Sequence, residues 1–214
     1  MLELYTYFRS SAAFRVRIAL NLKGLAWEPH VVWLPSGEHR GESYRQVNPQ
    51  ALVPTLVDGE LKLNQSLAII EYLDETQPGP KLLPPDPAGR ARVRSLSMLI
   101  ASEIHPVNNL RVLNYLKGEL GLDEERVAGW YRHWCDEGLA AFEAQLAQGG
   151  IGRYCHGDEV TMADVCLVPQ IFNARRFGTE VGKYPLTMRI HDELVKLDAF
   201  ERASPGAQPE ASRA

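Results

Sequence analysis

The sequence has few cysteines and no long apolar run. Its 214 residues include three cysteines, Cys135, Cys155 and Cys166, which form neither a CxxC pair nor an even disulfide framework. No apolar run approaches the roughly 18 residues that a membrane-spanning helix needs. Residues 1–7 place no basic stretch before an apolar one, so we expect no secretory signal. The simplest expectation is a reduced, cytoplasmic protein without a membrane partner.

A strong charge of either sign is also missing. Lys and Arg number 23 and Asp and Glu 27, a formal net charge of -4 with neutral His. Nucleic-acid-binding proteins typically carry a basic patch, so we expect no nucleic-acid partner. The six histidines show no H-x-x-x-H or Cys/His ligand spacing, and we predict no metal site. The hydrophobic share of 45% is enough for the core of one domain or two small ones.

A cluster of prolines interrupts the chain after its first third. Residues 77–80 read Gln-Pro-Gly-Pro and residues 84–87 read Pro-Pro-Asp-Pro. Such a stretch cannot continue a helix or a central strand. It predicts a linker between two domains, residues 1–80 and residues 88–214.

Short strands and helices alternate before the linker. Apolar periodicity and turn residues predict this order: a strand at 2–7, a helix at 11–22, a strand at 27–33, a short or irregular helix at 39–47, two strands at 53–57 and 61–63, and a helix from Ser66 to before Pro78. Asp58-Gly59 between the last two strands is a hairpin signal. The order β-α-β-α-β-β-α combines a crossover with a later hairpin.

Helical patterns dominate after the linker. They cover residues 91–117 and 123–146, the run after residues 161–164, and residues 185–197. Pro106 predicts a kink or break inside the first of these. Thr161-Met162-Ala163-Asp164 is a capping-box pattern. We expect the tail from Ser204 to be frayed and Cys155, in a loop, to carry an exposed thiol.

Two serines stand where the first strand passes into the first helix. A helix N-terminus concentrates unpaired amides and a partial positive charge. A hydroxyl of Ser10 or Ser11 could donate there to a bound thiolate and favour its ionised form. A serine before a helix is more often only an N-cap. Spacing alone leaves both interpretations open.

Two further junctions could contact a ligand. If the bond between Val53 and Pro54 is cis, the Val53 backbone can turn outward and pair with a peptide-like ligand, although a trans edge proline is the commoner case. Gln65-Ser66 begins the next helix, where amides can bind a carboxylate or Ser66 can act as a simple cap. Of Arg15 and Arg17, inside the first helix, we expect one to face solvent or a partner subunit.

Several segments together resemble the zeta class of glutathione transferases. They are YFRSSAAFRVRIALNLKG at 7–24, NPQALVPTL at 48–56, QSLAIIEYL at 65–73, and residues 104–110, 161–164 and 174–177. The resemblance covers nearly the whole chain to about residue 203. The class includes maleylacetoacetate isomerases and bacterial maleylpyruvate isomerases.

The resemblance implies an α+β fold, with a thioredoxin-like N-terminal domain, an all-α C-terminal domain and a homodimer. It also implies glutathione as the cofactor. The residues expected to contact glutathione are Ser10, Ser11, Ala12, Ala13, Phe14, Arg15, His39, Val53, Pro54, Gln65, Ser66, His105, Asn109, Leu110 and Arg111. Ala12 stands where many members of the class have Cys, which puts in doubt any mechanism that needs a protein sulfur.

The activity implied is the isomerisation of maleylacetoacetate to fumarylacetoacetate, a step of tyrosine and phenylalanine catabolism. Ser10, Ser11 and Arg9 are the expected catalytic residues, and Arg9, Arg111 and Arg176 are expected to hold the carboxylates of a dicarboxylate substrate. Three alternatives stay open: a maleylpyruvate isomerase of a gentisate pathway, a general glutathione transferase that also dehalogenates α-haloacids, and a non-catalytic binding module. The last is disfavoured because Gln65 and Ser66 accompany the paired serines.

Overall fold

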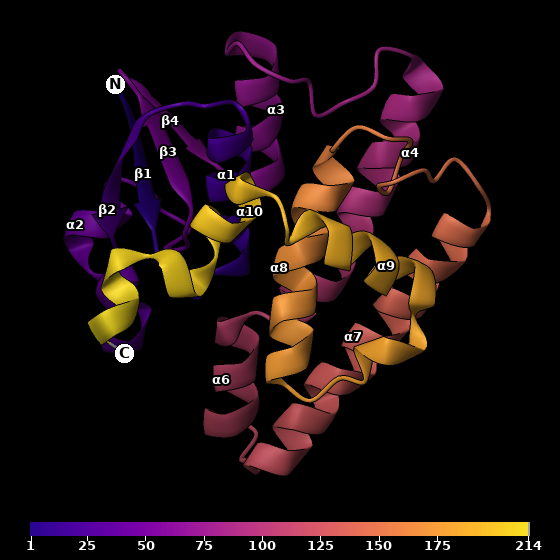
Figure 1. Cartoon of the computed structure of the whole chain (residues 1–214). Coiled ribbons are helices and arrows are strands. Elements are labelled where there is room, and N and C mark those ends of the chain that lie inside the picture. The colour runs from indigo at the N-terminus through magenta and orange to yellow at the C-terminus, as the bar shows by residue number, and fades with distance from the viewer. Residues whose placement is uncertain (214) are drawn as a thin grey trace. The chain divides into compact units, whose positions relative to one another are not determined.

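A computed structural model describes residues 1–213 (Figure 1). Its contacts divide the chain into two compact units. One comprises Met1–Leu82 together with the chain from Lys196 onward, and the other comprises Leu83–Val195. Each unit is built around a different kind of core.

The first unit contains a four-stranded sheet in the order β2-β1-β3-β4. Its strands are β1 (Leu2–Thr6), β2 (Trp27–Val31), β3 (Thr55–Asp58) and β4 (Leu61–Asn64). β1 runs parallel to β2 and antiparallel to β3, and β3 and β4 form the predicted hairpin. The crossover between β1 and β2 is α1 (Ser11–Leu22), and α3 (Ser66–Thr76) follows β4. This is the predicted thioredoxin-like fold, which the structure confirms.

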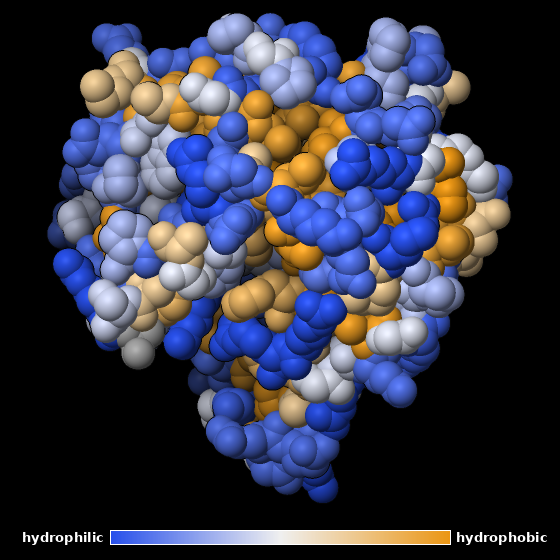
Figure 2. All heavy atoms as spheres, in the orientation of Figure 1, coloured by the Kyte–Doolittle hydropathy of each residue, from blue (hydrophilic) through white to orange (hydrophobic). Residues whose placement is uncertain are grey.

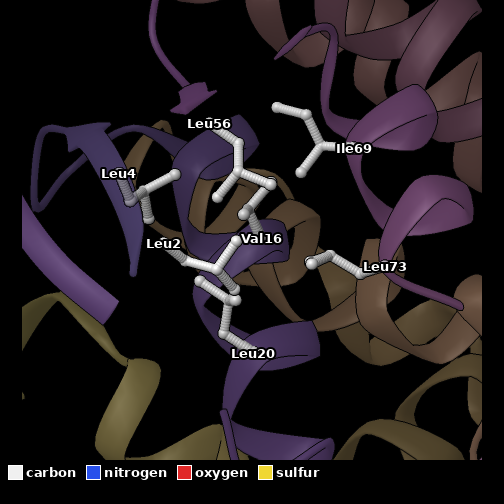
Figure 3. Close-up of a cluster of buried hydrophobic side chains, with 7 residues drawn as sticks. All are labelled: Leu2, Leu4, Val16, Leu20, Leu56, Ile69 and Leu73. Atoms are coloured by element: carbon white, nitrogen blue, oxygen red, sulfur yellow. The ribbon is translucent and has the colours of Figure 1, made fainter. Parts of the chain in front are cut away.

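Alternation along the strands explains the core of this unit. β1 has the burial pattern of a strand with one face covered, because successive side chains point to opposite faces. Figure 3 shows the covered face, where side chains of β1 and β3 meet those of α1 and α3. The cluster consists of Leu2, Leu4, Val16, Leu20, Leu56, Ile69 and Leu73. Its burial holds α1 and α3 against one face of the sheet.

The C-terminal segment packs with the sheet unit. α10 (Asp198–Ala203) contacts α1, and Asn21 Nδ2 donates to the Ala199 carbonyl at 3.0 Å. The turns η5 (Pro205–Ala207) and η6 (Pro209–Arg213) follow, and Glu210 within them is buried. The expected frayed tail is therefore wrong. The predicted second domain ran to residue 214, whereas residues from Lys196 onward group with the first unit. Helical periodicity could not reveal this, because it does not say which unit a helix covers.

The second unit is built from helices. Their bounds are α4 (Pro87–Met98), the π-helical η3 (Leu99–Ile104), α5 (His105–Val107), α6 (Leu110–Gly118), α7 (Glu124–Ala147), α8 (Met162–Arg176), η4 (Val181–Lys183) and α9 (Pro185–Leu194). The predicted break near Pro106 is observed as a π-helical turn before it and a new start at Leu110. Gly138 of α7 packs against this turn, since a Cβ atom there would lie 2.1 Å from Ile104 Cγ1.

The predicted capping box at the start of α8 is confirmed. Asp164 Oδ2 accepts from the Thr161 amide at 2.7 Å, and its Oδ1 accepts from the Cys155 amide at 2.9 Å. That second bond draws the preceding loop inward, so Cys155 is buried and the expectation of an exposed thiol is wrong. Cys135 and Cys166 are buried as well.

Hydrophilic residues cover most of the face that Figure 2 shows. Among residues 1–213, no helix is both long and apolar enough to cross a membrane.

Candidate functional site

The strand register brings several predicted site residues to one edge of the sheet. Tyr5 of β1 pairs with Thr55 of β3, and Thr55 pairs with Asn64 of β4. The residues just beyond these pairs therefore meet at the same edge. They are the start of α1 after β1, Val53-Pro54 before β3, and Gln65-Ser66 after β4. β2 also ends there, because it runs parallel to β1.

A turn between β1 and α1 presents the paired serines. The Ser10 amide donates to the Tyr7 carbonyl at 2.9 Å, and Ser10 Oγ accepts from the Ala13 amide at 3.2 Å as the N-cap of α1. The capping interpretation of Ser10 is thus correct, yet its hydroxyl hydrogen can still donate to a ligand. Ser10 is half-buried, whereas Ser11 is only 4% exposed. The first turn of α1, which is fully described, contains no acidic residue to offset the positive helix end.

An arginine connects the two helix starts at this edge. Arg15 Nη1 donates to Ser66 Oγ at 3.2 Å, so α1 and α3 are joined near their N-termini. Arg15 is 1% exposed, and Ser66, Ala13 and Phe14 are buried as well. Among the predicted contact residues 11–15, Ala12 alone is half-buried. The side chains of the other predicted contact residues in this stretch are buried beneath this edge of the sheet.

The Val53–Pro54 peptide bond is cis. The loop before it is anchored by its own carbonyl, since Leu52 O accepts from Tyr44 Oη at 2.7 Å and from Asn48 Nδ2 at 2.7 Å. Both Val53 and Pro54 are buried. The backbone of this loop is thereby held at the edge of the sheet.

Gln65 adopts an unusual backbone conformation. Its φ of 71° lies in the left-handed region, although it is not glycine. Such a residue costs on the order of 1–3 kcal/mol and persists where the surroundings hold it, often at functional sites. Its exposed side chain donates through Nε2 to Gln50 Oε1 at 3.1 Å.

Two predicted residues flank the edge with charge or an imidazole. Arg9 is exposed, and its guanidinium carbon lies 4.9 Å from the centre of the Phe8 ring. His39, in η2 (Glu38–Arg40), is half-buried, and burial together with the neighbouring Arg40 lowers its pKa. His39 is therefore neutral at pH 7 and can both donate and accept one hydrogen bond.

The remaining predicted site residues lie in the helical unit. Asn109 caps α6 by accepting from the Arg111 amide at 3.1 Å, and its Nδ2 lies 3.5 Å from His105 Nε2. Leu110 and Arg111 are exposed in the first turn of α6. Arg176 is exposed at the end of α8.

Within the helical unit, three residues that the sequence analysis missed connect the start of α6 to the end of α8: Asn108, Tyr131 and Phe177. Asn108 Nδ2 donates to the Tyr131 carbonyl at 3.3 Å, and the Tyr131 ring stacks on Phe177 with centroids 3.9 Å apart. The Arg176 guanidinium lies 5.7 Å from the Phe177 ring centre. A signal was present in the adjacent pairs Asn108-Asn109 and Arg176-Phe177, but Tyr131 lies 22 residues after Asn109 and 45 residues before Arg176.

Neither the residues at the sheet edge nor the predicted site residues of the helical unit have the donor set of a metal site. Within residues 1–213, no three His, Cys, Asp or Glu side chains are grouped so that they could hold a metal ion. The sheet edge instead offers a hydroxyl, a helix end and loop backbone groups, which suit a peptide-like anion.

Comparison with known proteins shows extensive similarity. Residues 4–81 match the family Glutathione S-transferase, N-terminal domain, and residues 135–195 match Glutathione S-transferase, C-terminal domain. A probable maleylacetoacetate isomerase of Vibrio cholerae is 50% identical over 212 residues, which cover 98% of each chain.

Two solved structures are similar over nearly their whole length. A holo structure of a bacterial maleyl pyruvate isomerase, described as a zeta-class glutathione S-transferase, has a TM-score of 0.95 and 46% identity, covering 98% of this chain and 99% of that one. Maleylacetoacetate isomerase from Methylobacterium extorquens AM1, with bound malonate and GSH, has a TM-score of 0.95 and 43% identity, with coverage of 98% and 99%.

Proposed function

The chain belongs to the zeta class of the glutathione S-transferase family, and from this premise we propose that it is a glutathione-dependent isomerase that converts maleylacetoacetate to fumarylacetoacetate. The observation that carries the proposal is the start of α1, where the half-buried Ser10 hydroxyl meets an unneutralised helix N-terminus. A bound thiol at this place is favoured in its thiolate form by the hydroxyl and the helix end.

The proposed reaction uses the thiolate as a recycled nucleophile. Its sulfur adds to the conjugated double bond, and the electron pair of that bond moves to the adjacent carbonyl as an enolate. The former double bond is now single and rotates. The enolate pair then returns, the carbon–sulfur bond breaks, and the trans product and the thiolate are released. No atom is oxidised or reduced, and the thiolate is regenerated.

Glutathione is the sulfur that fits this chemistry. All three cysteines are buried within the helical unit, and burial raises the pKa of the Cys135 and Cys155 thiols. Ala12 provides no thiol beside the serines. Relatives of this class have glutathione in the active site. We propose Ser10 as the donor to its sulfur, because Ser11 is almost completely buried.

The sheet unit is proposed to bind the rest of the tripeptide. Backbone groups of Val53 can pair with its peptide groups, and the start of α3 at Gln65-Ser66 can bind a carboxylate. Supporting roles remain proposed for Ala12, Ala13, Phe14, Arg15, His39 and Pro54, and contacts from the helical unit for His105, Asn109, Leu110 and Arg111. The helical unit is proposed to bind the substrate.

A cytoplasmic homodimer is proposed on the class resemblance, and a solution mass near the 24.0 kDa of one chain would contradict the dimer.

The substrate carboxylates are proposed to bind Arg9 and Arg176, with Arg111 as a third candidate. All three are exposed and can bind carboxylate in a bidentate way. We expect Arg176→Glu to raise KM for the dicarboxylate by about tenfold or more, because attraction becomes repulsion. Arg175→Glu is the matched control, since Arg175 is the adjacent exposed arginine. Equal KM values for the two variants in steady-state assays would exclude the role of Arg176.

Thorough removal of low-molecular-weight thiols tests the function directly. We expect isomerisation of maleylacetoacetate to fall by at least about 100-fold and to return when glutathione is added. Unchanged turnover without thiols would refute the mechanism. The similarity to the maleyl pyruvate isomerase supports a second candidate substrate, maleylpyruvate. The ratio of kcat/KM values on the two substrates decides between them, and glutathione conjugation or α-haloacid dehalogenation is assayed in parallel as a side activity.

A further inference from the structure

Arg17 lies inside the sheet unit, behind the turn that carries Ser10. It is 1% exposed, so the expectation that one of Arg15 and Arg17 faces outward is wrong for both. A buried arginine is costly unless its donors are satisfied. Arg17 Nη2 donates to the Phe8 carbonyl at 3.1 Å, and Nη1 lies 3.0 Å from Thr6 Oγ1 and 3.4 Å from the Tyr7 carbonyl.

Tyr7 and Phe8 belong to the turn that leads into α1, and Thr6 is the last residue of β1 before that turn. The Tyr7 carbonyl also accepts from the Ser10 amide, so one oxygen joins the guanidinium to the residue that carries the hydroxyl. Phe8 is the next residue of the same turn. Since Arg17 is in the second turn of α1, it connects the body of the helix to the loop that precedes it. The planar guanidinium can hold several carbonyls at once in a fixed geometry.

The C-terminal segment completes the surroundings of Arg17. Nε donates to the Ala203 carbonyl at 3.0 Å, at the end of α10. Burial lowers the pKa of Arg17 to about 10, while the charge of Glu210, buried in η6, opposes this. Arg17 therefore stays charged at neutral pH. The acceptors on Thr6, Tyr7 and Phe8 and the Ala203 carbonyl leave it little freedom to move.

We propose that Arg17 is a positioning residue, whose hydrogen bonds to Thr6, Tyr7 and Phe8 hold the turn so that Ser10 stands correctly for the bound sulfur. This inference rests on the proposed function for its catalytic consequence. The mechanical part, that Arg17 holds the turn, does not depend on it. Misplacement of a reacting group by about 1 Å can cost about 100-fold in rate, so a loosened turn should lower kcat more than substrate affinity.

Arg17→Lys tests the proposal, because it keeps the charge and loses the fork of donors. Four quantities are measured: kcat, KM for glutathione, the pKa of the bound glutathione thiol from the ultraviolet absorbance of its thiolate, and amide hydrogen exchange over residues 8–11. We expect kcat to fall by about tenfold or more, the thiol pKa to rise, KM to change by less than about threefold, and exchange to quicken by about tenfold.

Val16→Ala is the matched control for loss of stability. Val16 is the neighbouring residue of α1 and packs in the apolar core (Figure 3), with no role in the turn. We expect it to lower the Tm without changing kcat, thiol pKa or exchange at residues 8–11. Thr6→Val, which removes one acceptor of Arg17, should change the same quantities in the same direction but less, and it serves if Arg17→Lys fails to fold.

The outcomes separate the two proposals. Wild-type kcat, thiol pKa and exchange in Arg17→Lys, or in Thr6→Val if only that variant folds, would overturn the positioning role. If the wild-type enzyme proves inactive as an isomerase, the exchange measurement still decides whether Arg17 holds the turn. Faster exchange with unchanged kcat and thiol pKa would also overturn the role. Arg17 would then hold the turn, but the position of the turn would not affect catalysis.

Discussion

Replacing Ser10 by Gly lowers the kcat of isomerisation by about 100- to 1000-fold, which is the usual loss when a donor to a developing or bound anion is removed. Gly at an N-cap costs only about a few tenths of a kcal/mol relative to Ser, and it has no side chain that could donate to the sulfur. The expected result is an enzyme with a nearly unchanged Tm and a raised pKa of the bound glutathione thiol. Steady-state kinetics and the thiolate absorbance measure the two effects.

Two further variants complete the Ser10 experiment. Ser10→Thr keeps both a cap and a hydroxyl, so its kcat should stay within about tenfold of the wild type. Ser11→Ala should have a small effect, because Ser11 is buried and Ser10 is the residue that caps α1. Wild-type rates in Ser10→Gly, or a larger loss in Ser11→Ala, would remove Ser10 from the proposed role.

Replacing Lys23 by Met destabilises the sheet unit by about 3–5 kcal/mol, the usual result of leaving one partner of a buried ion pair alone. Lys23 Nζ lies 3.1 Å from Asp74 Oδ1, with side-chain exposures of 0% and 7%. It also donates to the Pro80 carbonyl at 3.1 Å. Asp74 in turn accepts from the Leu82 amide, so the pair connects α1, α3 and the start of the linker. Urea denaturation followed by circular dichroism measures the loss.

An exposed ion pair supplies the control for Lys23. Lys117 and Glu124 lie 3.0 Å apart with side-chain exposures of 45% and 92%, and such surface pairs contribute about 0–1 kcal/mol. Lys117→Met should therefore leave the unfolding midpoint almost unchanged. If Lys23→Met were no more destabilising than Lys117→Met, the buried Lys23–Asp74 pair would contribute no more to the free energy of unfolding than an exposed pair.

Short-range patterns predicted the elements well because their causes are local. Asp58-Gly59 defines the hairpin through its own turn geometry, and Asp164 caps its helix three residues after Thr161. Pro106 disrupts the helix that contains it for a reason that lies in its own ring and missing amide hydrogen. Ser10 is an N-cap, as its position before a helix indicates.

The failures concern contacts between distant residues. Arg15 and Arg17 look like surface residues in a helical pattern, yet each is buried and bonded to groups that the chain supplies elsewhere, such as Ser66 and the Ala203 carbonyl. Cys155 is drawn inward by Asp164. No periodicity within a window of residues contains the information that such a partner is nearby.

The sequence by itself determined the order of strands and helices, the family, and the residue types at the start of α1, because these depend on neighbours along the chain and on matching motifs. Only the tertiary structure decided that Ser10 is accessible while Ser11 is covered, that the C-terminal segment packs on α1, and that Arg17 is bonded to the turn before it. These features arise from burial, and the burial of a side chain depends on what the rest of the chain places against it.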